Sequence, residues 1–123
     1  MTQVIFLDFD GVLSNFIQAQ VVISSSWRDG MTKSQLNELF KEYAHRVVGK
    51  TISQQGMSRQ AEIMAYVKQH NVTCYIALDD DCRNTLFAPN CDFLFKTNYF
   101  TGLTIEKLPA LIQFMQQRGF TEF

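Results

Sequence analysis

A short apolar run that ends in two acidic residues constrains the fold of this chain more than any other feature. The run is Val4-Ile5-Phe6-Leu7, and Asp8-Phe9-Asp10-Gly11-Val12 follows it directly. Four consecutive apolar residues predict a buried strand of a parallel sheet. Side chains that follow such a strand emerge at the carboxyl end of the sheet, where open α/β sheets bind their ligands. Two neighbouring carboxylates repel each other, and a hard divalent cation would balance them because it prefers carboxylate oxygens.

Further strand-like runs recur along the chain, and helical patterns lie between several of them. We expect strands at residues 4–7, 21–23, 47–48, 74–78 and 93–95. Three helices are expected, with Thr32, Ser58 and Thr104 at their N-termini and Gly119 after the end of the last one. This alternation predicts an α/β fold with a mostly parallel five-stranded sheet and helices on both faces, in one domain over residues 1–123.

The second and third helices carry apolar residues at helical spacing. Ile63, Met64 and Val67 are expected to face the core from the second helix. The residues expected to do so from the third helix are Leu108, Leu111, Ile112 and Met115.

The charge and the cysteines exclude several classes of protein. Lys and Arg number 11 and Asp and Glu 12, which gives a net charge of −1 and no general attraction to nucleic acid or to a membrane. The three cysteines, Cys74, Cys82 and Cys91, form no C-x-x-C motif, so we interpret them as small hydrophobic residues and expect neither a disulfide scaffold nor a zinc site. No signal-peptide pattern or long apolar span is present, which favours a cytoplasmic protein.

Polar residues follow the other predicted strands in the same way. Ser24-Ser25-Ser26-Trp27-Arg28 comes directly after residues 21–23, and a hydroxyl there can bind a phosphate oxygen. Arg59 lies at the start of the second helix, where a cation can balance the charge of a phosphate. Asp79 and Asp80 follow the strand at 74–78, which adds acids to the same edge of the sheet.

With these groups in order, the chain resembles a phosphatase domain of the haloacid dehalogenase (HAD) superfamily. Asp8-Phe9-Asp10-Gly11-Val12 matches the first motif of that superfamily, Ser24 the second, Arg59 the third and Asp79-Asp80 the acidic fourth. The chain is more closely similar to the HAD domains of Swiss army knife RNA repair proteins. That similarity rests on Ser24-Ser25-Ser26-Trp27-Arg28, on Arg59 with Glu62-Ile63, and on Thr101-Gly102-Leu103-Thr104.

The resemblance implies a Rossmann-like HAD fold and a Mg²⁺-dependent phosphatase. Asp8 would be the nucleophile that forms an aspartyl-phosphate, and Asp10 the general acid and base. Mg²⁺ would be held by Asp8, by Asp10 and by an acid of the fourth motif, for which Asp80 is preferred to Asp79 because of its spacing to Asn84. Ser24 or Ser25, together with Arg59, would bind the phosphoryl group.

The chain also departs from the family pattern, because the stretch after the first motif is short. Only seven residues, Ser14 to Gln20, separate Leu13 from Val21, whereas a parallel crossover usually needs about a dozen residues. The segment is therefore a tight return, an exchange with a second chain or a deletion, and the protein is a monomer or a segment-exchanged dimer. The usual flap is missing and a cap domain has no room, which favours a large phosphorylated substrate such as a nucleic-acid end or a phosphoprotein.

Two alternatives to the phosphatase stay open. A chain that lost turnover with its flap would be a non-catalytic HAD-like domain that binds phosphate or metal. A phosphoacceptor domain of the receiver type also gathers acids, a hydroxyl and a lysine at strand ends. The order of the groups disfavours the receiver type, because no single Asp ends the strand at residues 47–48.

Overall fold

The computed structural model describes residues 3–7, 20–24, 34, 47–51, 56–81, 85–98 and 104–121. Its strands are β1 (Gln3–Leu7), β2 (Gln20–Ile23), β3 (Val47–Lys50), β4 (Cys74–Asp79) and β5 (Leu94–Lys96). Its helices are α2 (Arg59–His70), the 3₁₀ turn η3 (Ile105–Lys107) and α3 (Leu108–Gln117). The helix expected after Thr32 lies outside the described residues, apart from residue 34.

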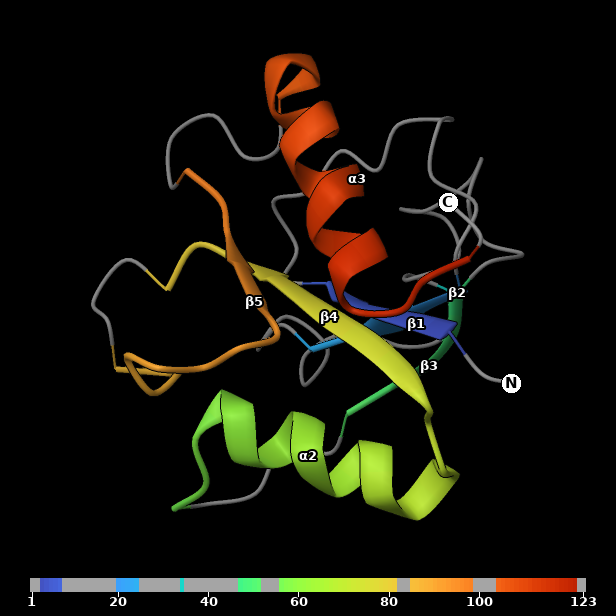
Figure 1. Cartoon of the computed structure of the whole chain (residues 1–123). Coiled ribbons are helices and arrows are strands. Elements are labelled where there is room, and N and C mark those ends of the chain that lie inside the picture. The colour runs from blue at the N-terminus through green and yellow to red at the C-terminus, as the bar shows by residue number, and fades with distance from the viewer. Residues whose placement is uncertain are drawn as a thin grey trace.

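The strands form one sheet in the order β3-β2-β1-β4-β5, and every neighbouring pair is parallel. Figure 1 shows α2 and α3 on opposite faces of this sheet. The α/β fold with a parallel sheet that the sequence predicts is therefore confirmed. In the described part of the chain, no helix is long and apolar enough to span a membrane.

The core follows the twofold alternation of strand side chains. On the α2 face, Phe6 packs edge-on against Tyr66 with ring centroids 5.5 Å apart, beside the fully buried Ile63. On the other face, Phe95 of β5 contacts Phe114 of α3 with centroids 5.7 Å apart. Each face of the sheet is thus covered by a helix, and both helices are held by aromatic contacts.

Helix α2 begins where its sequence predicts, and the structure shows how it ends. Ser58 has an extended backbone, and its Oγ accepts a hydrogen bond from the N–H of Ala61 at 3.1 Å, which satisfies a donor of the first turn. Asn71 adopts a left-handed conformation after the last turn, and Val72 then leads into β4. The first turn of α2, which carries Arg59, is therefore fixed in place.

Two details of the helix predictions were wrong. Met64 is 50% exposed and does not face the core, because the buried face of α2 is formed by Glu62 and Ile63. Thr104 does not cap α3 directly, since a 3₁₀ turn over residues 105–107 intervenes and Pro109 occupies the first turn of α3. Gly119 does follow the end of α3 with a φ of +94°, a conformation that glycine tolerates best.

The connection between the first two strands is longer than the sequence count assumed. β1 ends at Leu7 and β2 begins at Gln20, so the crossover runs over residues 8–19. This length reaches the dozen or so residues that a parallel crossover needs. The count from Leu13 was wrong because it started after Asp8-Phe9-Asp10-Gly11-Val12 instead of at the end of the strand. Residues 8–19 lie outside the described part of the chain.

Candidate active site

The carboxyl ends of the central strands are level with one another. Leu7 of β1 is in register with Ile23 of β2 on one side and with Leu78 of β4 on the other. The residues that follow these three positions in the sequence are Asp8, Ser24 and Asp79. The strands that precede the first, second and fourth predicted motifs therefore end at the same edge of the sheet.

Ser24 and a second hydroxyl residue, Thr51, lie at this edge on the β2 and β3 side. Ile23 is in register with Lys50, and each of the two hydroxyl residues follows directly after one member of that pair. Both residues are 1% exposed. Thr51 was not predicted as a site residue, because the strand expected at residues 47–48 extends to Lys50 in the structure and only then ends directly before Thr51.

Arg59 and Asp79 form a buried ion pair at this edge. Arg59 Nη1 donates to Asp79 Oδ2 at 2.7 Å, and the two side chains are 12% and 0% exposed. Little water reaches the pair, so the charge of each group depends on the other. Asp79 also compensates for the unfavourable position of a cation at the N-terminus of α2. The ion pair joins the third and fourth predicted motifs.

Asp81 shapes the loop that follows β4. Its Oδ1 accepts hydrogen bonds from the N–H groups of Thr85 and Leu86 at 3.1 and 3.0 Å, and its Oδ2 accepts one from Phe87 at 3.2 Å. Its own N–H donates to Asp79 Oδ1 at 2.9 Å, and its φ of +35° is a left-handed value that Asp adopts more readily than most residues. Asp81 is thus a structural residue, a role that sequence reasoning missed.

Helix α2 is tied to the same loop through Gln60. The Gln60 N–H donates to the Leu86 carbonyl at 3.1 Å, and the Gln60 side-chain oxygen accepts a bond from the Ala88 N–H at 2.6 Å. The first turn of α2 therefore contacts the end of β4 through Arg59 and the following loop through Gln60. This arrangement fixes the position of the arginine.

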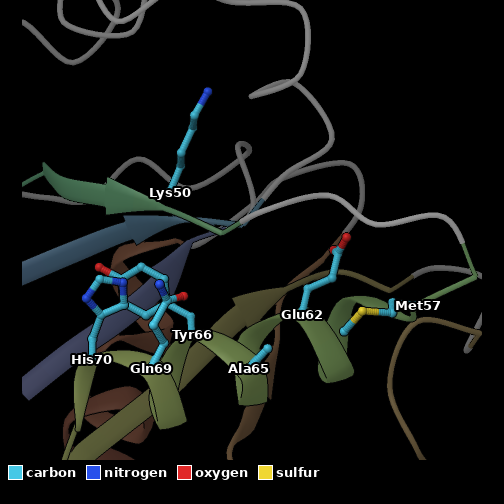
Figure 2. Close-up of a pocket in the computed structure, with 7 residues that line it drawn as sticks. All are labelled: Lys50, Met57, Glu62, Ala65, Tyr66, Gln69 and His70. Atoms are coloured by element: carbon cyan, nitrogen blue, oxygen red, sulfur yellow. The ribbon is translucent and has the colours of Figure 1, made fainter.

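A pocket of about 100 Å³ lies along α2 and extends to the end of β3. Figure 2 shows its lining residues, with Met57 and Glu62 at one end and His70 and Gln69 at the other. The rings of Tyr66 and His70 are stacked, with centroids 4.1 Å apart and planes 28° apart. Burial raises the pKa of the Tyr66 hydroxyl above its ordinary value. The full lining is Lys50, Met57, Glu62, Ala65, Tyr66, Gln69 and His70.

The cysteines that the structure describes are unsuited to nucleophilic chemistry. Cys74 is buried and donates its thiol hydrogen to the Arg118 carbonyl at 3.2 Å, and Cys91 is half-buried. Burial raises the pKa of both thiols, which keeps them protonated. Their interpretation as packing residues is confirmed, and Cys82 lies outside the described residues.

The described residues contain no group of three His, Cys, Asp or Glu side chains that could hold a metal ion. Asp8 and Asp10, the two acids of the first motif, lie outside the described part, as does Ser25. Of the two acids at the end of β4, Asp79 uses both carboxylate oxygens, one for Arg59 and one for the Asp81 N–H. Asp80 is half-buried beside it. Carboxylate oxygens such as those at this edge are ligands that a hard cation such as Mg²⁺ prefers, and the choice between Asp80 and Asp79 stays a prediction.

The structure therefore brings together part of the predicted constellation. Arg59 contacts Asp79 directly, Asp80 follows Asp79, and Ser24 lies at the same edge beside the end of β1. The roles of Asp8, Asp10, Ser24, Ser25, Arg59, Asp79 and Asp80 in binding and catalysis stay predictions.

Comparison with known proteins gives one match. The family model described as "HAD domain in Swiss Army Knife RNA repair proteins" matches residues 13–108. This range includes Ser24, Arg59, Asp79 and Asp80, and it begins just after Asp8-Phe9-Asp10-Gly11-Val12. The comparisons with curated proteins and with solved structures found no match.

Proposed function

We propose that this chain, which belongs to the family of HAD domains in Swiss Army Knife RNA repair proteins, is a Mg²⁺-dependent phosphatase that acts through Asp8. Family membership supports a hydrolase of the HAD kind. The main structural support is the buried contact between Arg59 and Asp79 at the carboxyl edge of the sheet. This contact holds a cation where the phosphoryl group would bind. A guanidinium has five N–H donors, so its bond to Asp79 is compatible with a second bond to a phosphoryl oxygen.

The proposed reaction has two steps. A carboxylate oxygen of Asp8 attacks phosphorus and forms an aspartyl-phosphate, while the bond from phosphorus to the ester oxygen breaks and Asp10 gives that oxygen its proton. Asp10 then takes a proton from water, whose oxygen attacks phosphorus. The Asp8–phosphorus bond breaks, inorganic phosphate leaves, and both carboxyl groups return to their starting states. Ser24, Ser25 and Arg59 hold the phosphoryl oxygens through both steps.

The carboxylates of Asp8 and Asp80 and the backbone carbonyl of Asp10 would hold Mg²⁺. When bound, the ion would supply charge neutralisation between the carboxylates and the phosphoryl oxygens. Asp79 would position other residues of this site, because its carboxylate orients Arg59 and the start of the loop after β4.

The substrate would be a large phosphorylated molecule. The expectation from the sequence is a site without a cap domain, and such a site would leave a small substrate exposed to water. A nucleic-acid end fits this expectation, and so does a phosphoprotein.

The test is phosphate release by the purified chain with Mg²⁺ from 5′- and 3′-phosphorylated RNA and DNA and from small phosphoesters. Asp8→Asn is the matched control, because it keeps the shape of the side chain and removes the nucleophile. Activity is expected in the wild type and a loss of at least about a thousandfold in Asp8→Asn. Equal activity in the two proteins would reject Asp8 as the nucleophile, and no release from any substrate would reject the phosphatase.

The second candidate is a non-catalytic HAD-like domain that binds phosphate or metal. It is favoured by the crossover over residues 8–19, which is long enough to join β1 and β2 but leaves no residues for an additional flap. Calorimetry that detects Mg²⁺ binding, together with no hydrolysis of any phosphoester, would support this candidate. A trapped aspartyl-phosphate would exclude it.

A further inference from the structure

Two N–H groups in the first turn of α2 are engaged within the protein. N–H groups at the start of a helix have no partner inside the helix and can bind a phosphate. Here the Ala61 N–H donates to Ser58 Oγ at 3.1 Å. The Gln60 N–H donates to the Leu86 carbonyl, also at 3.1 Å. Because these two donors are occupied, phosphate binding at this end of α2 depends more on the Arg59 guanidinium.

That guanidinium belongs to a closed ring of contacts. Arg59 Nη1 donates to Asp79 Oδ2 at 2.7 Å, and Asp79 Oδ1 accepts from the Asp81 N–H at 2.9 Å. Asp81 Oδ1 in turn accepts from the Leu86 N–H at 3.0 Å. The Leu86 carbonyl accepts the Gln60 N–H, and a peptide bond joins Gln60 to Arg59. The ring therefore links the end of β4, the loop after it and the first turn of α2.

The Gln60 side chain makes a second bond between α2 and this loop. Its Oε1 accepts from the Ala88 N–H at 2.6 Å, two residues beyond the Leu86 carbonyl that accepts the Gln60 N–H. Two bonds from one residue hold the first turn against the loop in one orientation, whereas a single bond would let it rotate. The side chain of Gln60 thus strengthens the ring at the residue next to Arg59.

From this arrangement we propose that Gln60 is a positioning residue of the phosphate site and acts through Arg59. The inference rests on the proposed function and deepens it, because it names the contact that aligns the phosphate-binding cation. With its bond to the Ala88 N–H, Gln60 keeps the first turn of α2 in place and the guanidinium in the orientation that a phosphoryl oxygen would meet. Without that bond the first turn shifts against β4, and the alignment of Arg59 is partly lost.

Binding of inorganic phosphate, measured by calorimetry in the presence of Mg²⁺, tests this role. Gln60→Ala is expected to weaken binding about threefold to tenfold, the range that the net contribution of one hydrogen bond covers. The matched control is Gln69→Ala, an exposed glutamine in the last turn of the same helix, which is expected to leave the affinity unchanged. In an Arg59→Gln background, Gln60→Ala is expected to have no further effect, because it acts through the arginine.

A second measurement follows Arg59 itself and needs neither phosphate nor turnover. Exchange of the Arg59 Nε hydrogen with water, observed by NMR, is slow while the guanidinium is held in its buried pair. Gln60→Ala is expected to speed this exchange severalfold, and Gln69→Ala to leave it unchanged. Gln60→Glu keeps an oxygen for the Ala88 N–H and is expected to restore slow exchange. Thermal unfolding checks that each variant is folded.

The outcomes separate this inference from the proposed activity. Unchanged phosphate affinity or unchanged exchange in Gln60→Ala would overturn the inference, and so would equal weakening in the wild-type and Arg59→Gln backgrounds. Phosphate binding that depends on Gln60 through Arg59, without hydrolysis of any phosphoester, would support the inference and reject the phosphatase. Hydrolysis that Arg59→Gln impairs and Gln60→Ala does not would have the opposite meaning. A chain that binds no phosphate would reject both the phosphate site and the role of Gln60 in it.

Discussion

Arg59 and Asp79 form an almost fully buried ion pair that joins the first turn of α2 to the carboxyl end of β4. Arg59 Nη1 lies 2.7 Å from Asp79 Oδ2, and the Asp79 side chain is completely buried. Two charges removed from water in this way stabilise the protein only while both are present. The pair therefore couples the stability of the fold to the site that we propose for phosphate.

We expect Asp79→Asn to destabilise the protein by about 3 kcal/mol, because it leaves the guanidinium of Arg59 nearly buried beside a neutral group. Denaturation in guanidinium chloride measures the loss. Removing the charge of Arg59 as well, in Arg59→Met with Asp79→Asn, is expected to cost less than the sum of the two single changes. Strictly additive losses would show that the two groups do not depend on each other.

Mg²⁺ binding should distinguish Asp80 from Asp79. Both carboxylate oxygens of Asp79 already accept a protein hydrogen bond, so an ion bound by Asp79 would share an oxygen with the Arg59 guanidinium or with the Asp81 N–H. At an effective dielectric constant of about 20, a carboxylate about 4 Å from a divalent ion contributes several kcal/mol. Asp80→Asn is therefore expected to weaken Mg²⁺ binding at least about a hundredfold.

The Mg²⁺ affinities of the two variants are compared by calorimetry on folded protein, without denaturant and at a temperature well below unfolding. Asp79→Asn should lower stability more than Asp80→Asn and weaken Mg²⁺ binding less. The reverse order of Mg²⁺ affinities would make Asp79 the metal ligand. If both variants bound Mg²⁺ as tightly as the wild type, the ion would lie elsewhere.

Much of the fold could be predicted from the sequence because each strand is a short apolar run that the helices cover. The runs beginning at Val4, Cys74 and Val47 extend in the structure by a residue or two beyond the apolar stretch, as Gln3, Asp79 and Lys50 show. Backbone pairing adds these polar end residues to the strands. Apolar composition alone does not reveal that pairing.

The site was less predictable, because a residue type does not reveal its partner. Three consecutive acids at Asp79, Asp80 and Asp81 have the same sequence signal, yet one pairs with an arginine on α2 and another holds a loop by three N–H groups. Glu62 is buried on α2 although it is acidic, whereas the apolar Met64, which was expected in the core, is exposed. Such contacts depend on tertiary packing and not on local pattern.

The loop after β4 should depend on Asp81. Asp81→Ala would leave the N–H groups of Thr85, Leu86 and Phe87 without their acceptor, and Phe87 is buried. Each buried donor that loses its partner costs about 1–3 kcal/mol, so we expect a total loss of about 3 kcal/mol in the free energy of unfolding. Chemical denaturation measures it.

Asp81→Asn and Asp92→Ala are the controls for this loop. Asn keeps an oxygen for Thr85 and Leu86 and tolerates the left-handed backbone at this position, so its loss should be smaller than that of Ala. Asp92 is exposed and reaches Arg118 only at 3.4 Å, so its replacement is expected to change stability by no more than about 0.5 kcal/mol. If Asp81→Ala were as mild as Asp92→Ala, the three hydrogen bonds would not hold the loop.

Gly49 and Tyr66 should show a steric coupling. A Cβ added at Gly49 would lie 2.9 Å from the Tyr66 hydroxyl oxygen, whereas the nearest ring carbons would be 3.7 Å away, an ordinary contact. Gly49→Ala is therefore expected to destabilise the protein by about 1–2 kcal/mol, although alanine in a strand is usually preferred to glycine. In a Tyr66→Phe background the hydroxyl is gone, and the same change should be neutral or stabilising. Denaturant unfolding of the four proteins in this cycle measures the difference, and an equal penalty in both backgrounds would show that the Tyr66 hydroxyl does not require glycine at position 49.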